Sequence, residues 1–189
     1  MTIADVSLSV EEFLQQSYVD DSPAWEYIAG SMSQKPMPKP QHSRLQLKLA
    51  MAINDVTEPQ KIAVAFPELR CSFGDRSIVP DIAVLPWANI PFNGVGELEN
   101  EAIAFPPAWT IEILSSGQRS TKVIDNILYC LEFGCRLGWL LDPDDRAVLV
   151  FQPNQGLQIF RADDVPTFPP EMPFQLTVNQ IFSWLSFGQ

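Results

Sequence analysis

Hydrophobic residues recur along the chain with two spacings, and these spacings predict where helices and strands lie. Apolar residues three or four positions apart indicate amphipathic helices, whereas short apolar runs between turn residues indicate strands. We expect helices at 9–14, 42–56, 121–133 and 177–185. We expect strands at 25–32, 62–66, 71–75, 77–86, 109–114, 137–141, 147–151 and 157–161.

Capping and turn residues agree with these boundaries. Ser9 and Glu12 have the spacing of a capping box at the start of the first helix. Alternate prolines exclude a helix from Lys35 to Pro40 and predict an extended loop there, because proline lacks an amide donor and biases its neighbours to extended geometry. Residues 88–107 are rich in Pro, Gly, Asn and Glu, which predicts a surface insertion.

The order of these elements predicts the fold class. Neither an internal repeat nor a clear linker interrupts the 189 residues, so we expect one domain spanning 1–189. Helices and strands alternate in groups, which favours an α/β (α+β) architecture with a mixed sheet flanked by helices. An apolar content of 46% with 19% charged residues is typical of a globular protein with a substantial core.

Composition also limits where the protein acts. No apolar run reaches the roughly 18 residues of a membrane span, and residues 1–6 lack the basic and hydrophobic regions of a signal peptide. Cys71, Cys130 and Cys135 are too few and too irregularly spaced for a disulfide framework or a zinc site. We therefore expect a cytoplasmic protein with reduced thiols and no membrane partner.

Charge is distributed unevenly. A net charge of −11 argues against a general nucleic-acid binder, although acidic side chains that bind a cation reverse the local sign. No acidic residue occurs between Glu26 and Asp55. This acid-free window contains Lys35, Lys39, His42, Arg44 and Lys48. It is either a phosphate-binding region or an ordinary solvated surface.

Two carboxylates indicate the chemistry. Asp81 and Glu112 are each the single charge in an apolar, strand-forming run, and a buried charge is costly unless it is paired or binds a cation. Carboxylate oxygens are suitable ligands for a divalent metal ion. We expect both acids to emerge where adjacent strands converge and to share one ion. The alternative is that each acid pairs with an arginine, such as Arg70 or Arg119, or caps a neighbouring turn.

Three further residues complete the candidate site. Phosphodiester hydrolysis is helped by a cation near the attacking water, commonly a lysine two residues after the second acid, but that position is Leu114. Lys122, in the first turn of the following helix, is the nearest substitute or else a solvated lysine. Glu26 is either a third acid of the site or a strand ion-pair partner. His42, the only histidine, is either a general base or phosphate ligand or a structural helix-start residue.

Several motifs together resemble the Uma-two family of restriction-endonuclease-like proteins, in the PD-(D/E)XK superfamily. The resemblance covers about 8–185 and rests on Trp25-Glu26-Tyr27-Ile28-Ala29-Gly30, His42, Pro80-Asp81-Ile82-Ala83-Val84, Glu112-Ile113-Leu114-Ser115, Tyr129 and Gly138-Trp139-Leu140-Leu141-Asp142-Pro143. It implies a restriction-endonuclease-like fold and a homodimeric DNA endonuclease that depends on Mg²⁺ or Mn²⁺. It also implies that Asp81 and Glu112 are the metal ligands and that Glu26 and His42 line the site.

Two positions depart from the family pattern. Many members have a lysine where this chain has Asn126, and the usual proline after the second acid is replaced by Ser116. Two hypotheses follow: an active endonuclease in which Lys122 supplies the missing ammonium, or an inactive nuclease fold that binds nucleic acid or a protein partner. A structural dimer formed through aromatic residues of the 88–107 insertion is a third reading.

Overall fold

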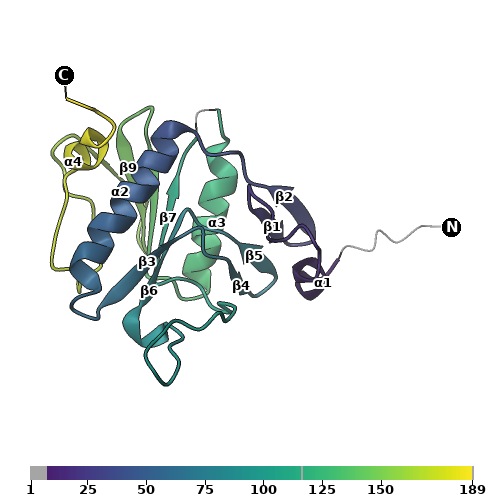
Figure 1. The fold of residues 1–189 in the computed structure, drawn as a ribbon. Coiled ribbons are helices and arrows are strands. Elements are labelled where there is room, and N and C mark those ends of the chain that lie inside the picture. Colours follow the sequence, from purple (N-terminus) through teal and green to yellow (C-terminus); the bar gives the residue numbers. More distant parts are fainter. Residues whose placement is uncertain (1–7, 116, 189) are drawn as a thin grey trace.

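The protein is built on a six-stranded sheet (Figure 1). The computed structural model describes residues 8–115 and 117–188. The strands of this sheet are β3 (Ala63–Pro67), β6 (Ile82–Pro86), β7 (Trp109–Ile113), β8 (Leu137–Asp142), β9 (Ala147–Phe151) and β10 (Gln158–Arg161). Their spatial order is β10-β9-β8-β7-β6-β3. β7 and β8 are parallel, and the other neighbouring pairs are antiparallel.

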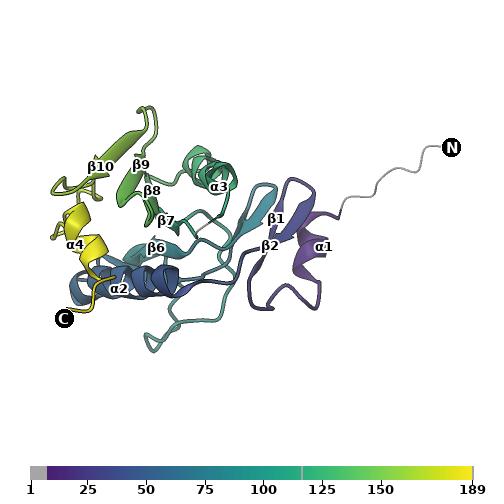
Figure 2. The same cartoon turned by 90° about the horizontal axis from the view of Figure 1, so that it is seen from above.

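Helices cover both faces of this large sheet. The helices are α1 (Val10–Leu14), α2 (Pro40–Thr57), α3 (Ser120–Glu132) and α4 (Val178–Ser183), with a short 3-10 turn at Trp87–Asn89. α2 and α4 lie on one face and α3 on the other (Figure 2). Successive strand side chains point to opposite faces, so Ile111 and Ile113 pack into the core beneath α2, together with Leu45 and Leu49. The intervening Glu112 consequently belongs to the α3 face.

A second, smaller sheet stands beside the large one (Figure 2). Its strands are β1 (Trp25–Ile28), β2 (Ser31–Gln34), β4 (Cys71–Phe73) and β5 (Arg76–Ile78), in the order β2-β1-β5-β4. All of its neighbouring pairs are antiparallel. α1 packs against it through Phe13, whose ring stacks on Tyr27 with centroids 5.6 Å apart. The mixed α/β fold class expected from the sequence is confirmed.

The predicted elements are present, with several corrections to their extents. The capping box is confirmed, since the Ser9 side chain accepts from the Glu12 amide and Glu12 accepts from the Ser9 amide. The strand predicted at 25–32, in which Gly30 indicates a turn or bulge, is a hairpin of two strands, because the backbone reverses at Ala29 and Gly30, both with positive φ. The run 77–86 is divided between the two sheets at Pro80, which has no amide hydrogen for a strand ladder.

The buried face of α3 also differs from the prediction. The helical spacing of Ile124, Ile127, Leu128 and Leu131 predicts that these four residues face the core. Leu128 is instead 46% exposed, whereas Val123, Asn126 and Ile127 are buried. α3 therefore buries a polar side chain, Asn126, near its middle, on the face that meets Glu26 of β1. The hydrophobic pattern alone could not show this, because Asn126 is buried against another polar group rather than against apolar residues.

Loop regions complete the described structure. Most of 88–107 is exposed, as expected of an insertion, but Trp87, Phe92 and Phe105 are partly buried against the core. These aromatic side chains are therefore not a free apolar surface, which contradicts the basis of the structural-dimer reading. None of the helices in the described ranges is long and apolar enough to cross a membrane. Ser116, the residue in place of the usual proline, and residues 1–6, which lack a signal-peptide pattern, lie outside those ranges.

Candidate active site

Strand pairing places the two key carboxylates opposite one another. β6 and β7 pair with Ile82 opposite Ile111, and extending this antiparallel register by one residue sets Asp81 opposite Glu112. The alternation of side chains puts both on the face that α3 covers. Both are buried, with exposures of 2% and 4%. The convergence expected from the sequence is therefore present.

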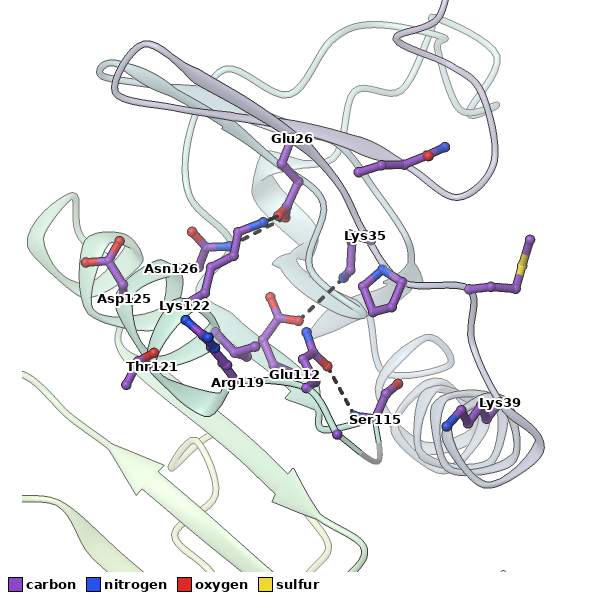
Figure 3. A pocket seen from close by; sticks show the side chains of 16 residues that line it. Glu26, Lys35, Lys39, Glu112, Ser115, Arg119, Thr121, Lys122, Asp125 and Asn126 are labelled. Carbon is purple, nitrogen blue, oxygen red and sulfur yellow. Dashed lines mark hydrogen bonds and ion pairs between the residues drawn. The ribbon is translucent and has the colours of Figure 1, made fainter.

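A lysine ammonium lies between these carboxylates. The Nζ of Lys35 is 2.7 Å from Oδ1 of Asp81 and 3.5 Å from Oε2 of Glu112, and it donates to the Val79 carbonyl at 2.7 Å. Lys35 follows β2 directly, in the proline-containing connection to α2, and its side chain points into the site (Figure 3). Three oxygens thus surround one positive charge. The sequence places Lys35 in the acid-free window and at the start of the proline-rich loop, and neither feature predicts a position between two carboxylates.

The other oxygen of Asp81 is fixed by two donors. Oδ2 lies 2.9 Å from Nε2 of His42 in the first turn of α2 and accepts the backbone amide hydrogen of Ile113 at 2.7 Å. Gln46, one turn further along α2, donates to the Asp81 main-chain carbonyl at 2.8 Å. Burial opposes ionisation of Asp81, but the Lys35 charge and the His42 interaction outweigh it and hold the Asp81 pKa well below its usual range.

Glu112 and Lys35 are shifted in the same direction by different causes. Burial raises the pKa of Glu112 well above its usual value; Lys35 opposes this, while the negative charges of Asp81 and Glu26 add to it. Burial disfavours the Lys35 ammonium, but the nearby Asp81, Glu112 and Glu26 carboxylates more than compensate and raise its pKa. Lys35 is consequently the stable internal cation of an acidic site.

A second polar cluster adjoins the first. Glu26 on β1 is 3% exposed, and its carboxylate accepts from the Val79 amide at 3.2 Å, from Lys122 at 3.2 Å and from Asn126 at 3.5 Å. Lys122 also donates to the Ser33 hydroxyl at 2.7 Å. The predicted site residue Lys122 therefore neutralises Glu26 in the structure, and the ammonium between Asp81 and Glu112 belongs to Lys35.

An open cavity of about 920 Å³ gives access to these clusters. Glu26, Glu112, Lys35 and Lys122 reach its wall, while neither Asp81 nor His42 is among the residues that line it. The loop before α2, the turn before α3 and the first half of α3 also line the cavity, and Gln118 is one of these residues. Figure 3 shows Lys39, Arg119 and Asp125 among them. Cationic side chains at the rim and carboxylates on the floor are a suitable arrangement for a phosphate bound beside a metal ion.

The arginine pairing considered for Asp81 is wrong. Asp81 is paired with Lys35 and His42. Arg70 instead donates to the main-chain carbonyls of Trp25 and Val19, and Arg119 lines the cavity. Lys35 lies nine residues after Glu26, just beyond the hairpin that returns the chain to the same end of β1, but no local sequence signal separates it from Lys39.

The donor set fits a hard divalent cation. In the described part of the chain, no three His, Cys, Asp or Glu side chains converge as a ready-made metal site. Mg²⁺ does not require such a cage, because it commonly binds one or two carboxylates and keeps several waters. The Lys35 ammonium already occupies a position shared by two carboxylates and a carbonyl. Its surroundings are therefore those of a cation site with hard oxygen ligands.

Comparison with known proteins agrees with a nuclease-like fold. Residues 10–179 match the Uma2 family, described as "Putative restriction endonuclease", and the chain belongs to this family. It is also similar to a protein of Anabaena variabilis ATCC 29413, described as "a putative nuclease belonging to DUF820", whose crystal structure was determined at 1.96 Å. The two are 45% identical, with a TM-score of 0.90 and coverage of 95% of this chain and 99% of that chain. Comparison with curated proteins gave no match.

Proposed function

We propose that this protein is a DNA endonuclease that depends on Mg²⁺ or Mn²⁺, with Asp81 and Glu112 as the metal ligands. The observation that carries the proposal is the pair of buried carboxylates at adjacent strand positions, both in contact with one ammonium on the floor of an open cavity. Family membership supports the same activity class. A bound divalent ion would supply Lewis-acid stabilisation of phosphate charge and a water of lowered pKa.

The residues of the chain have distinct roles in this proposal. Asp81 and Glu112 provide anionic oxygens, and Asp81 stays ionised because its pKa is lowered. His42 and the Ile113 amide fix the orientation of Asp81, so that only Oδ1 faces Lys35. Arg119 at the rim and Lys122 beside Glu26 are positioned to attract the DNA backbone, since phosphate contacts come mainly from cationic side chains.

One observation favours a second function, in which the fold binds nucleic acid without cutting it. Leu114 is partly buried against the core beneath α3 and cannot supply an ammonium, while Asn126 and Lys122 are both engaged with Glu26. If Lys35 remained fixed between the carboxylates, the protein would bind DNA at the cavity rim without hydrolysing it. Metal dependence of cleavage separates the two functions.

The test is a cleavage assay on plasmid and single-stranded DNA with Mg²⁺ or Mn²⁺. We expect nicking by the native chain and a loss of at least about 10²-fold in Asp81→Asn and Glu112→Gln, in line with the removal of a principal charge-stabilising group. Asp142→Asn is the matched control, because Asp142 is also an acid at a strand end but accepts from the amides of its own turn. Absence of cleavage by the native chain with either metal would exclude the endonuclease.

A Lys122→Ala variant tests the role predicted for this lysine from the sequence. If Lys122 contacts a DNA phosphate, the plot of log DNA affinity against log salt concentration has a shallower slope for Lys122→Ala than for the native chain. The difference corresponds to about one phosphate contact. Loss of cleavage with unchanged DNA affinity would instead indicate that Lys122 acts near the reacting phosphate.

A homodimer and a cytoplasmic location also stay predictions. Sedimentation of the purified chain would test the homodimer.

A further inference from the structure

The second oxygen of Asp81 restricts how a metal ion can enter the site. Oδ2 already accepts from the Ile113 amide and contacts His42, so Oδ1 is the oxygen directed toward Glu112. A hard divalent ion binds carboxylate oxygens at roughly 2.0–2.6 Å. An ion that used Oδ1 of Asp81 and Oε2 of Glu112 would therefore take the position of the Lys35 ammonium, whose Nζ is 2.7 Å and 3.5 Å from those two oxygens.

Electrostatics prevents the two cations from sharing this position. A divalent ion and an ammonium in van der Waals contact repel strongly when both are shielded from water, and the Lys35 side chain is only 15% exposed. Lys35 has a free direction of movement, however, since it lines the open cavity.

We propose that Lys35 is an internal counter-ion that holds the metal position between Asp81 and Glu112, and that a divalent ion binds there only by displacing it into the cavity. The inference rests on the proposed metal-dependent function and adds to it. In the metal-free protein, Lys35 neutralises two buried acids. After this exchange of the ammonium for the divalent ion, the Lys35 ammonium lies at the cavity wall. There it provides the positive charge that Leu114 and Asn126 do not.

The first experiment measures the accessibility of Lys35 in the native protein. Lysine side chains are acetylated briefly with acetic anhydride, with and without Mn²⁺, and modification at each position is quantified by mass spectrometry. Exchange predicts that Mn²⁺ increases acetylation of Lys35 several-fold. Lys61, at the exposed turn before β3, is the internal control and should not change. Unchanged or reduced acetylation of Lys35 at saturating Mn²⁺ would overturn the exchange.

The second experiment measures Mn²⁺ affinity by calorimetry in Lys35→Met and Lys39→Met. Both variants remove one positive charge from the cavity wall, but only Lys35 has its ammonium between the two carboxylates. Since a nearby opposite charge commonly shifts carboxylate equilibria by one to three log units, we expect Lys35→Met to bind Mn²⁺ at least about tenfold more tightly than Lys39→Met. Equal Mn²⁺ affinities of the two variants would show that only the net charge of the cavity matters, and this result would contradict the exchange.

Thermal melting adds a readout that is independent of DNA. Lys35→Met should melt several degrees below the native chain in EDTA, because Asp81 and Glu112 lose their counter-ion, and Mn²⁺ should raise its melting temperature by more than that of the native chain. The native chain could bind Mn²⁺ without any change in Lys35 acetylation, while Lys35→Met and Lys39→Met bind Mn²⁺ equally well. In that case the exchange fails and the proposed function stands. If neither protein binds Mn²⁺, both proposals fail.

Discussion

At the scale of single residues, the site depends on the orientation of one carboxylate. One oxygen of the Asp81 carboxylate contacts Lys35, and the other contacts both His42 and the Ile113 amide. Buried charges of this kind are costly when one partner is removed, because the remaining group is left without compensation. His42 is consequently best understood as a positioning residue for Asp81.

Replacement of His42 should separate the hydrogen bond from the volume of the ring. His42→Ala removes the donor to Asp81 and should lower the free energy of unfolding by about 1.5–3 kcal/mol, the range for a buried hydrogen bond to a charged group. His42→Gln should recover part of this loss, because its amide can reach toward Oδ2 and Nδ1 of His42 has no hydrogen-bond partner in the described structure to replace. Urea unfolding of the two variants makes the comparison. Equal losses would argue against a hydrogen-bonding role.

Residues differ in how clearly the sequence reveals them. Asp81 and Glu112 could be identified because a lone charge in an apolar strand has few harmless explanations. Lys35 could not, because it lies in a polar, proline-rich loop beside Lys39 and nothing local distinguishes the two. What selects Lys35 is its distance from carboxylates that follow 46 and 77 positions later in the chain, and that information exists only after folding.

At the scale of elements, α3 packs directly against the backbone of β8 at Gly138. A Cβ atom added at Gly138 on β8 would lie 2.2 Å from Cγ2 of Ile127 on α3. Real side chains do not approach so closely, so the absence of a side chain at 138 sets the separation of helix and sheet. The same helix presents Lys122 and Asn126 to Glu26. The separation of α3 from the sheet therefore determines whether Lys122 and Asn126 can reach Glu26.

Gly138→Ala should displace α3 and lower stability. We expect a loss of about 1–3 kcal/mol, the usual cost of overpacking a core. Combining it with Ile127→Ala, which removes the clashing methyl group, should give less destabilisation than the sum of the two single changes, because the residues are in direct contact. Urea unfolding of the four proteins in a double-mutant cycle provides the measurement. Additive losses would show that the contact does not limit the approach of α3.

The elements themselves were largely predictable. Strand and helix positions follow from local spacing, and the first capping box follows from two residues. The failures occurred where tertiary structure overrides a local pattern: Leu128 is exposed because α3 turns Asn126 toward Glu26. Likewise, the single run 77–86 is shared between two sheets because Pro80 interrupts the ladder.

At the scale of the whole molecule, three buried thiols share one core on the α3 side. Burial raises the pKa of Cys71 to about 12 and of Cys135 to about 11, and it also raises the pKa of Cys130. In the unfolded chain these thiols ionise near their ordinary value. Between that value and the raised one, the folded state holds more protons, so stability falls as pH rises.

This linkage predicts alkaline destabilisation that one substitution should reduce. The native chain should lose stability above about pH 9, and Cys135→Ala should lose less, because it lacks one of the shifted thiols. The difference in unfolding free energy between the two proteins should change by about 2 kcal/mol between pH 8 and pH 11. Urea unfolding across this range is the measurement. Parallel stability curves would contradict the shift assigned to Cys135.

The arrangement of the whole chain was the least accessible part of the prediction. A mixed sheet flanked by helices could be expected, and consecutive strands are commonly neighbours, as β6 to β10 are in the large sheet. The sequence pattern could not show that β3 pairs with β6 while the intervening β4 and β5 join a second sheet. The resemblance to a known family supplied the fold expectation that periodicity could not, and family membership is shown by the match over residues 10–179.

The two-sheet construction has a consequence for the dynamics of the site. The β1–β2 hairpin joins β5 through only two residue pairs, whereas β7 and β8 share five. Weakly attached hairpins open as cooperative units at a fraction of the global unfolding free energy. Such an opening withdraws Glu26 and Lys35 together and leaves Asp81 and Glu112 on the intact large sheet. The amide hydrogen exchange rate of residues 25–34 thus reports how often Asp81 and Glu112 lose the Lys35 ammonium while the rest of the protein stays folded.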